Sequence, residues 1–401
     1  MAIFRAALAL MLLVITVPSA AANPAPPTFL IAGSGLGHGV GMSQVGAFVQ
    51  AQNGRSSAEI LAHYYPAAQL IQVDDAVPIL VNVAANQTSL TLAATPIRKT
   101  DQTSLTITNL ETPINSIEAL NVTAENGNLV FTASSGELGR VPTAEISWPG
   151  VVGFSSAEPK SELMLTRADG SSSKYRFGPL LLSARGNSVQ AVLKLQVRDE
   201  YLNLVAEVAS TWPAAALEAQ AIASRSIAMT AVNAGAKTSC GCHVFSVGDQ
   251  NMRGSERYRL PGYANWRKAV RTTSGQVIGL DQKPVAAWFF ARSNGKTENS
   301  EDVWGSPRPW AKSVEDQFSI DPLAGPQVKW SVSVSAIQLA KLFKLPDVVK
   351  VQVASRNPGG SVRMFRAVSS TGEKALLSGR NLRAAIPTRS VWIEHIKPAA
   401  N

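Results

Sequence analysis

Hydrophobic and polar residues follow different periods along the chain, and the change of period divides it into regions. From residue 76 to about 165, runs such as SLTLAATP, SLTITNL and NLVFTASS alternate and are rich in Thr, Val and Leu. Turn residues such as Asn126-Gly127-Asn128 separate them. Alternation with a period of two is typical of half-buried strands. We therefore predict an inserted all-β module over residues 76–171.

Helix signals lie on both sides of this module. Ser43 is placed to cap a helix that runs to about Asn53, and Ser56 with Glu59 forms a capping box for a second helix. Thr211 is placed to cap a third, alanine-rich helix with Pro213 in its first turn. Further expected elements are two strands around the 185–188 turn, a hairpin around 281–283 and a helix over 335–343.

These elements predict an α+β fold with a core of mixed sheet and helices. The core is expected to have an N-terminal part, residues 23–75, and a larger part, residues 172–401, with the β module inserted between them. No chemistry is evident in the module, which suits a spacer or a binding surface.

Residues 1–22 have the pattern of a secretory signal peptide. Arg5 gives a positive start, an apolar run extends from Ala6 to Val17, and Ala20 and Ala22 form a cleavage pattern. The run is short for a membrane-spanning helix. The sequence thus predicts an exported protein of the cell envelope that meets the membrane only through its signal peptide.

Charge is distributed unevenly and bears on the partner. Residues 201–401 carry 25 Lys and Arg against 14 Asp and Glu, whereas residues 23–200 carry 11 against 14. A basic half in an exported protein favours an anionic polymer of the envelope as partner, with a merely solvated basic face as the alternative. Export and the lack of basic–aromatic clusters argue against nucleic acid.

Glu207 is the strongest candidate for chemistry. It lies among Leu204, Val205, Ala206 and Val208, just before the alanine-rich helix. Apolar surroundings disfavour the charged form of a carboxyl group and raise its pKa, as a general acid requires. An exposed carboxylate or half of an ion pair is the alternative. We find no partner acid for it: Glu218 lies beyond the Pro213 turn, and Asp199 and Glu200 are expected to be exposed.

The segment GSGLGHGVGMSQ, residues 33–44, has glycine at every second position of its first part. Such a backbone can adopt positive φ and approach other segments closely. No Lys follows the glycines, so we exclude a nucleotide site, and Gly295-Lys296-Thr297 lacks the spacing of a phosphate loop. His38 can exchange hydrogen bonds with sugar hydroxyls. Equally, His38, Ser43 and Gln44 can simply brace the loop.

Cys240, Cys242 and the adjacent His243 leave three interpretations open. A metal site would have at most three crowded ligands here, a disulfide would close a small ring, and a catalytic thiol would lack an orienting partner. We name no metal and no cofactor.

Several of these motifs together resemble the SpoIID/LytB family of sporulation stage II protein D and amidase-enhancer proteins. The similarity lies in Tyr201-Leu202, Glu207, Trp212-Pro213, Ala219-Gln220-Ala221 and Ser224-Arg225-Ser226. It continues in the 37–44 signature, Tyr64-Tyr65-Pro66, the Ser293, Gly295 and Thr297 turn, Val303-Trp304-Gly305 and the 378–383 segment. Val208-Ala209 departs from the family, which prefers Met-Pro after its glutamate.

The resemblance implies that the 37–44 signature packs beside Glu207 and helps to line a glycan groove. His38, Ser43, Gln44, Arg225, Ser293 and Thr297 are the substrate-binding candidates that follow from it. Trp304 and Trp310 would suit stacking on sugar rings, although we expect them to be core aromatics.

The resemblance implies the reaction of a peptidoglycan lytic transglycosylase. Ordinary glycosidases use two carboxyl groups, whereas one acid suffices when the C6 hydroxyl of the sugar replaces water. As the resemblance implies, Glu207 would then cleave the bond between N-acetylmuramic acid and N-acetylglucosamine in peptide-free strands and leave 1,6-anhydro ends. The alternatives are a LytB-like amidase enhancer that binds glycan and stimulates a cell-wall amidase, and a structural wall-binding protein.

Overall fold

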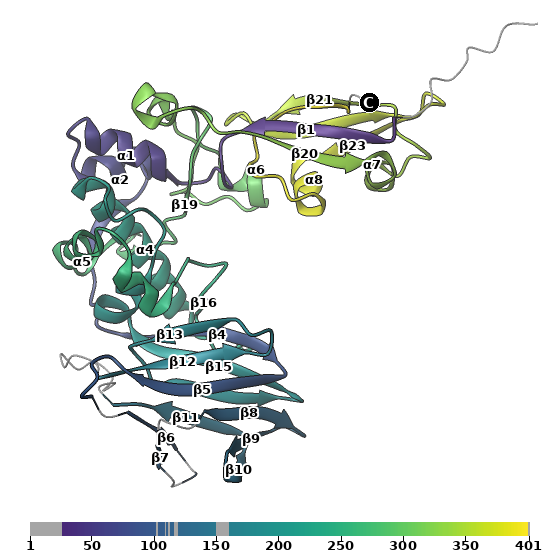
Figure 1. The fold of residues 1–401 in the computed structure, drawn as a ribbon. Coiled ribbons are helices and arrows are strands. Elements are labelled where there is room, and N and C mark those ends of the chain that lie inside the picture. Colours follow the sequence, from purple (N-terminus) through teal and green to yellow (C-terminus); the bar gives the residue numbers. More distant parts are fainter. Residues whose placement is uncertain are drawn as a thin grey trace, which may run out of the picture.

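The structure, a computed structural model, describes residues 26–399 apart from 102, 109, 111–112, 116–118 and 150–159. The expected signal peptide, residues 1–22, lies outside the described residues. A sandwich of strands lies at one end of the molecule, helices lie in the middle, and small sheets with short helices lie at the other end (Figure 1). This is the α+β fold that the sequence predicts. Within the described ranges, no helix has the length and apolar character needed to cross a membrane.

Two sheets pack face to face in the strand-rich unit. The first has the order β10-β9-β8-β5-β12-β13, and the second has the order β16-β4-β15-β14-β11-β6-β7. The first consists of β5 (Ser89–Pro96), β8 (Leu120–Glu125), β9 (Asn128–Ala133), β10 (Gly136–Val141), β12 (Ser161–Arg167) and β13 (Ser172–Tyr175). The second consists of β4 (Pro78–Gln87), β6 (Ser104–Ile107), β7 (Pro113–Asn115), β11 (Thr143–Ser147), β14 (Leu180–Arg185), β15 (Ser188–Gln196) and β16 (Val244–Phe245).

Alternation along these strands produces one core between the sheets. Leu90 and Leu92 of β5 are fully buried against Val81 of β4 and Leu193 of β15, while polar neighbours face outward. Strands β13, β14 and β15, which the sequence analysis placed after the module, pair within this sandwich. Apart from the short β16, the strand-rich unit therefore runs to Gln196.

Helix α4 (Ala214–Ala234) is the centre of the middle region. It packs among α1 (Gln44–Gln52), α2 (Ser57–Tyr64), α5 (Tyr263–Thr272) and the sheet of β3 (Gln69–Gln72), β17 (Gln276–Leu280) and β18 (Lys283–Pro284). Ala219, Ala221 and Ala223 are fully buried, which fits the prediction of an interior helix with little side-chain bulk. The expected cap was wrong, because Pro213 itself is the N-cap residue and Thr211 lies too far back to reach the first turn.

The two ends of the chain meet in a third region. Strand β1 (Thr28–Ser34) lies between β20 (Lys329–Ser335) and β24 (Ile393–Pro398), antiparallel to both (Figure 1). A second sheet of β21 (Lys350–Arg356), β22 (Val362–Val368) and β23 (Lys374–Ser378) shares its core, with α7 (Ala336–Phe343) and α8 (Gly379–Ala385). The pair β2 (Met42–Ser43) and β19 (Phe289–Phe290) and helix α6 (Ser300–Trp304) connect this region to the middle.

Most of the local signals behave as the sequence predicts. Ser43 accepts a hydrogen bond from the Gly46 N–H at the start of α1, and Ser56 and Glu59 form the expected capping box of α2. The 185–188 turn, the β17–β18 hairpin and the helix that starts after Ser335 are also confirmed. Gly41 has φ of +80°, and a side chain there would collide with the Trp288 carbonyl, so this glycine is required by the close approach of two backbones.

The buried carboxylate of Asp75 ties both ends of the strand-rich unit to the helical region. It lies 2.5 Å from Arg198 Nε and 2.7 Å from Arg225 Nε of α4, and it accepts from the Gly275 N–H. Asp75 precedes β4, the first strand of the sandwich, and Arg198 follows β15, its last strand apart from the short β16. Asp75 and Arg225 both have 0% exposed side-chain surface. One carboxylate thus joins the entry, the exit and the central helix.

Replacing Asp75 with Ala should strongly destabilise the protein, because it leaves the Arg225 guanidinium buried without its counter-ion. Breaking a buried pair from one side costs about 3–5 kcal/mol. Urea unfolding of the full chain measures this loss. Arg140→Ala is the matched control, since Arg140 pairs with Glu125 and Glu137 at the surface and exposed pairs contribute about 0–1 kcal/mol. Equal losses in the two variants would refute the role of Asp75.

Candidate functional site

Glu207 lies in the turn between a short π-helix and α4. The π-helix Val197–Tyr201 leads into the short α3 (Leu202–Leu204), whose residues are buried, and the chain then turns toward Pro213. Val205 pairs with Met252 in an isolated bridge. The turn therefore holds Glu207 against the 249–252 loop, with its side chain half-buried.

The surroundings of Glu207 have the electrostatic character that the sequence predicts. Its Oε1 accepts a 2.6 Å hydrogen bond from the Asn251 N–H. Burial raises the pKa of Glu207 above its ordinary value, and the hydrogen bond from Asn251 only partly opposes this. Within the described chain, no neighbouring charge contributes to the shift. A half-buried carboxyl group with a raised pKa can both donate and accept a proton.

The loop that contacts Glu207 was missed by the sequence analysis. Gln250 donates to the Tyr201 hydroxyl at 3.1 Å, and Asp249 accepts from the Phe245 N–H. Burial raises the pKa of Tyr201, and the negative charges of Glu207 and Asp249 raise it further. Tyr201 therefore remains a neutral hydroxyl beside the carboxylate. Only the polar run Asp249-Gln250-Asn251 could have pointed to this loop, and its distance from Glu207 in sequence concealed it.

Helix α1 of the glycine-rich signature packs beside the turn that carries Glu207. The Phe48 and Trp212 rings lie 5.0 Å apart between centroids, and Gln44 Nε2 donates to Gln220 Oε1 of α4. Gln44 is nearly buried, so it links two helices. The part of the signature that approaches Glu207 is thus its helix.

His38 lies elsewhere. Its Nδ1 accepts from the Val40 N–H within the same loop, and its ring contacts Phe290 and Trp304 at centroid distances of 5.7 and 5.0 Å. Burial and the charge of Arg383 lower its pKa to about 4, so His38 is neutral at neutral pH. These contacts match the bracing role, and none of them involves Glu207.

Ser43 and Ser293 meet around a buried carboxylate. Asp316 accepts hydrogen bonds from the hydroxyls of Ser293, Ser319 and Tyr64 at 2.6, 2.6 and 2.8 Å, and Ser43 Oγ lies 2.7 Å from Ser319 Oγ. Burial raises the pKa of Asp316 despite these donors. All five side chains are fully buried. The network joins segments far apart in the sequence and leaves these hydroxyls no free surface for a sugar.

Arg225 and Thr297 are also structural rather than exposed. Besides Asp75, Arg225 donates to the Val270 carbonyl at 2.8 Å, and Thr297 Oγ1 accepts from the Val314 N–H at 2.8 Å. Both side chains have no exposed surface. Arg225, Ser293, Thr297 and Ser43 are thus buried and hold the segments that carry the site, while their direct contact with a substrate stays a prediction.

Glu218 and Glu200, which lie near Glu207 in the sequence, form hydrogen bonds with other segments. Glu218 accepts from the Ser57 hydroxyl and thereby joins α4 to α2. Glu200 was expected to be exposed, but its exposed fraction is only 6%. It accepts a hydrogen bond from the Gln196 N–H at 2.7 Å. Burial raises its pKa to about 7. The π-helix turns this side chain inward, a geometry that the sequence pattern does not show.

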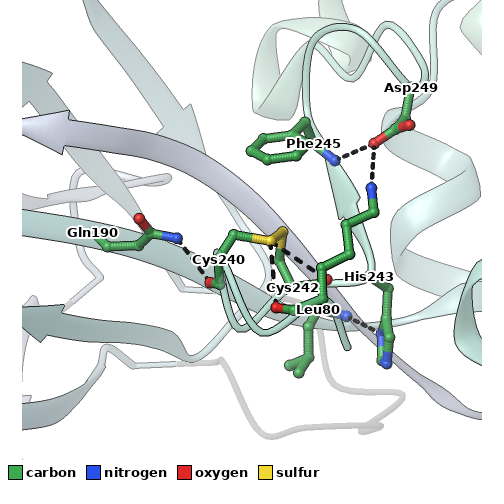
Figure 2. Close-up of a disulfide and its surroundings, with 8 residues drawn as sticks. Leu80, Gln190, Cys240, Cys242, His243, Phe245 and Asp249 are labelled. Atoms are coloured by element: carbon green, nitrogen blue, oxygen red, sulfur yellow. Dashed lines mark hydrogen bonds and ion pairs between the residues drawn. A yellow bond between two sulfur atoms is a disulfide. The ribbon is translucent and has the colours of Figure 1, made fainter. Parts of the chain in front are cut away.

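Cys240 and Cys242 form a disulfide, which decides among the three interpretations (Figure 2). The Cys240 carbonyl accepts from Gln190 Nε2 at 2.7 Å, and His243 Nδ1 accepts from the Leu80 N–H at 2.9 Å. Both sulfurs pack against Val192 of β15. The segment therefore fastens the chain after α4 to the edge of the sandwich.

A second buried carboxyl group, Glu298, lies behind the glycine-rich loop. Its Oε1 accepts from the Ser361 N–H at 2.7 Å, and its Oε2 accepts from the Ser361 hydroxyl at 2.9 Å. Its own N–H donates to the Gly39 carbonyl. Burial raises the pKa of Glu298 to about 7. Glu298 thus connects the loop to the C-terminal sheets through contacts that the sequence does not reveal.

Comparison with known proteins adds independent findings. Residues 185–279 match the family model described as SpoIID, Stage II sporulation protein. The chain is 27% identical to Stage II sporulation protein D of Bacillus amyloliquefaciens over 249 residues, 59% of this chain and 70% of that protein. The corresponding protein of Bacillus subtilis strain 168 is 26% identical over 60% of this chain and 72% of its own length. An amidase enhancer of the same strain is 26% identical over 33% of this chain and 16% of that protein.

Glu298 should make stability depend on pH. Its pKa is about 7 in the folded protein and about 4.5 without the fold. Between these two pKa values the folded state binds more protons than the unfolded state. The free energy of unfolding is therefore greatest below pH 4.5 and falls as the pH rises toward about 7. The unaltered chain should lose unfolding free energy between about pH 5 and pH 8. In Glu298→Gln, which mimics the neutral acid, we expect this loss to be smaller by about 1–3 kcal/mol.

Urea unfolding at the two pH values measures this effect. The exposed Glu373→Gln serves as the control and should leave the pH dependence unchanged. A Glu298→Gln variant with the same pH dependence as the unaltered chain would contradict the assignment.

Proposed function

We propose that this chain, which belongs to the SpoIID/LytB family, acts on the bacterial cell wall and cleaves peptide-free peptidoglycan strands with Glu207 as its single acid and base. The supporting observation is the half-buried Glu207 carboxyl group, whose pKa is raised by burial and which has one backbone N–H as partner. The alternative is the activity named for the amidase-enhancer relative. The chain would then bind glycan and stimulate a wall amidase.

The proposed reaction balances without a second carboxyl group. Protonated Glu207 gives its proton to the oxygen that bridges N-acetylmuramic acid and N-acetylglucosamine, and the bond from C1 to that oxygen breaks. The resulting carboxylate takes the proton of the C6 hydroxyl while O6 bonds to C1. Glu207 ends protonated again, and no water is consumed. A retaining or inverting glycosidase would need another acid in reach, whereas Glu200 and Glu218 are engaged elsewhere.

The location also follows from this proposal. Residues 1–22 would direct export, and the basic C-terminal half would face the anionic wall. A signal-peptide fusion to a reporter active only outside the cytoplasm tests export separately from catalysis.

Glu207→Gln should abolish cleavage while preserving binding, because glutamine keeps the shape and the acceptor for the Asn251 N–H but has no proton to transfer. Removing a general acid typically costs about 10²–10⁴-fold in rate. Purified protein is incubated with peptide-free glycan, and 1,6-anhydro ends are counted by mass spectrometry. Asp199→Asn, an exposed acid on the same approach to the site, is the control and should cleave normally.

The outcomes separate the two functions. Undiminished cleavage by Glu207→Gln would eliminate the proposed role of Glu207. Binding without cleavage by the unaltered chain, together with faster digestion when a wall amidase is added, would establish the enhancer instead.

The pH profile of kcat/KM provides a further test. Because Glu207 must start protonated and its pKa is raised above 4.5, activity should fall on the alkaline side with a midpoint above this value. A single catalytic acid predicts no acidic limb from a second carboxylate. A bell-shaped profile, measured where the fold is intact, would point to a second catalytic acid and overturn the mechanism.

A further inference from the structure

A cleft in the C-terminal region has the features of a binding site outside the Glu207 turn. It has a volume of about 410 Å³ and lies where α6, the start of β22 and α8 meet. Figure 1 shows α6 and α8 adjacent below the sheet that contains β1. Apolar residues such as Val303 and Ile393 line the cleft, together with Arg380 and Arg383 of α8.

Arg380 and Arg383 form no ion pair with any acid in the described part of the chain. Burial of the Arg383 guanidinium lowers its pKa. Arg380 lies so close over Gly305 that a side chain at this glycine would collide with the guanidinium. Two unpaired guanidinium groups facing one cleft favour an anionic ligand, since such groups match a carboxylate in a bidentate manner.

Trp304 adds a surface suited to a sugar ring. This side chain is 41% exposed and lines the cleft, so the expectation of a core tryptophan is wrong for it. The rings of His38 and Trp288 contact the Trp304 ring at centroid distances of 5.0 and 4.7 Å. An indole held in place at the edge of a cleft can stack on the apolar face of a sugar.

Asp302 distinguishes between kinds of anion. It also lines the cleft, and its Oδ2 accepts from Asn299 Nδ2. A carboxylate in the wall repels a doubly charged phosphate more strongly than a singly charged carboxylate, and it can accept a hydrogen bond from a hydroxyl group. The set of two guanidinium groups, one acid and one indole therefore suits a hydroxylated ring with one carboxylate.

We infer that this cleft binds a sugar that carries a free carboxylate, specifically a muramic acid unit whose lactyl group has lost its peptide. The inference rests on the proposed function, because it takes the glycan strand as the ligand. Arg380 and Arg383 hold the lactyl carboxylate, and Trp304 packs on the ring. A peptide attached to the lactyl group converts this carboxylate to an amide and removes the charge that the arginines recognise. The cleft thus selects stripped strands.

Calorimetric titration of the full chain tests this inference. N-acetylmuramic acid should bind at least about tenfold more tightly than N-acetylglucosamine or N-acetylmuramic acid with an amidated carboxyl group, because a charged hydrogen bond is lost in each comparison. Inorganic phosphate is the competitor that probes simple anion binding. Equal affinity for the neutral sugars, or displacement by phosphate at equal concentration, would overturn the inference.

Variants place the binding in the cleft. Arg380→Gln and Arg383→Gln should each weaken binding of N-acetylmuramic acid severalfold, and the double variant should lower it to the level of the neutral sugars. Arg366→Gln, an exposed arginine on β22 outside the cleft, is the matched control. Circular dichroism checks that Arg383→Gln folds. If Arg383→Gln does not fold, Arg380→Gln provides the test, because Arg380 is exposed. Unchanged affinity in Arg380→Gln would refute the assignment.

Catalysis and this site can fail independently. The titrations are repeated in the Glu207→Gln background, where no cleavage is expected, so binding there does not depend on the reaction. Loss of binding selectivity with cleavage retained would reject the cleft alone. Selective binding without cleavage would retain the cleft and reject the proposed reaction.

Discussion

The position of Glu207 depends on how the chain leaves the β sandwich, and the Asp75 carboxylate fixes that exit. Asp75 precedes β4 and Arg198 follows β15, and the buried Asp75 carboxylate pairs with both Arg198 and the buried Arg225 of α4. Arg198 belongs to the π-helix that leads within a few residues to Tyr201 and Glu207. A buried charge without its partner is costly, so the two ends of the inserted unit cannot separate freely. The sandwich can therefore be large without displacing the acid.

Asp316 has a similar role for the other motifs. Its three hydroxyl donors come from α2, from the turn that contains Ser293 and from a short 3-10 helix, while Ser43 joins through Ser319. Motif residues that resemble substrate ligands in sequence thus become the interior contacts between segments. Their hydroxyl groups satisfy a buried carboxylate, which would otherwise be unstable in this environment.

Local features of this fold could be predicted from sequence, and features that depend on distant partners could not. Ser43, Ser56 and Ser335 act within one helical turn, so their caps follow from neighbouring residues alone. The raised pKa of Glu207 follows from its apolar neighbours, but the Asn251 N–H that contacts it lies in a remote loop. The burial of Glu200 depends on a π-helix, and the burial of Arg225 depends on Asp75. Residue type alone left the fate of Cys240 and Cys242 open, because a disulfide requires a backbone geometry that only the fold supplies.

The separation of Glu207 from the arginine-lined cleft suits a polymeric substrate. The two lie on different elements: Glu207 accepts a hydrogen bond from the 249–252 loop, whereas Arg383 acts electrostatically on His38. On the proposed function, a long strand bound weakly in the cleft would keep its other sugars at a high effective concentration near Glu207, so that two weak contacts would act as one stronger one. On this view the glycine-rich segment connects the two places. The helix that follows it packs on the Glu207 turn, and His38 contacts Trp304 at the cleft.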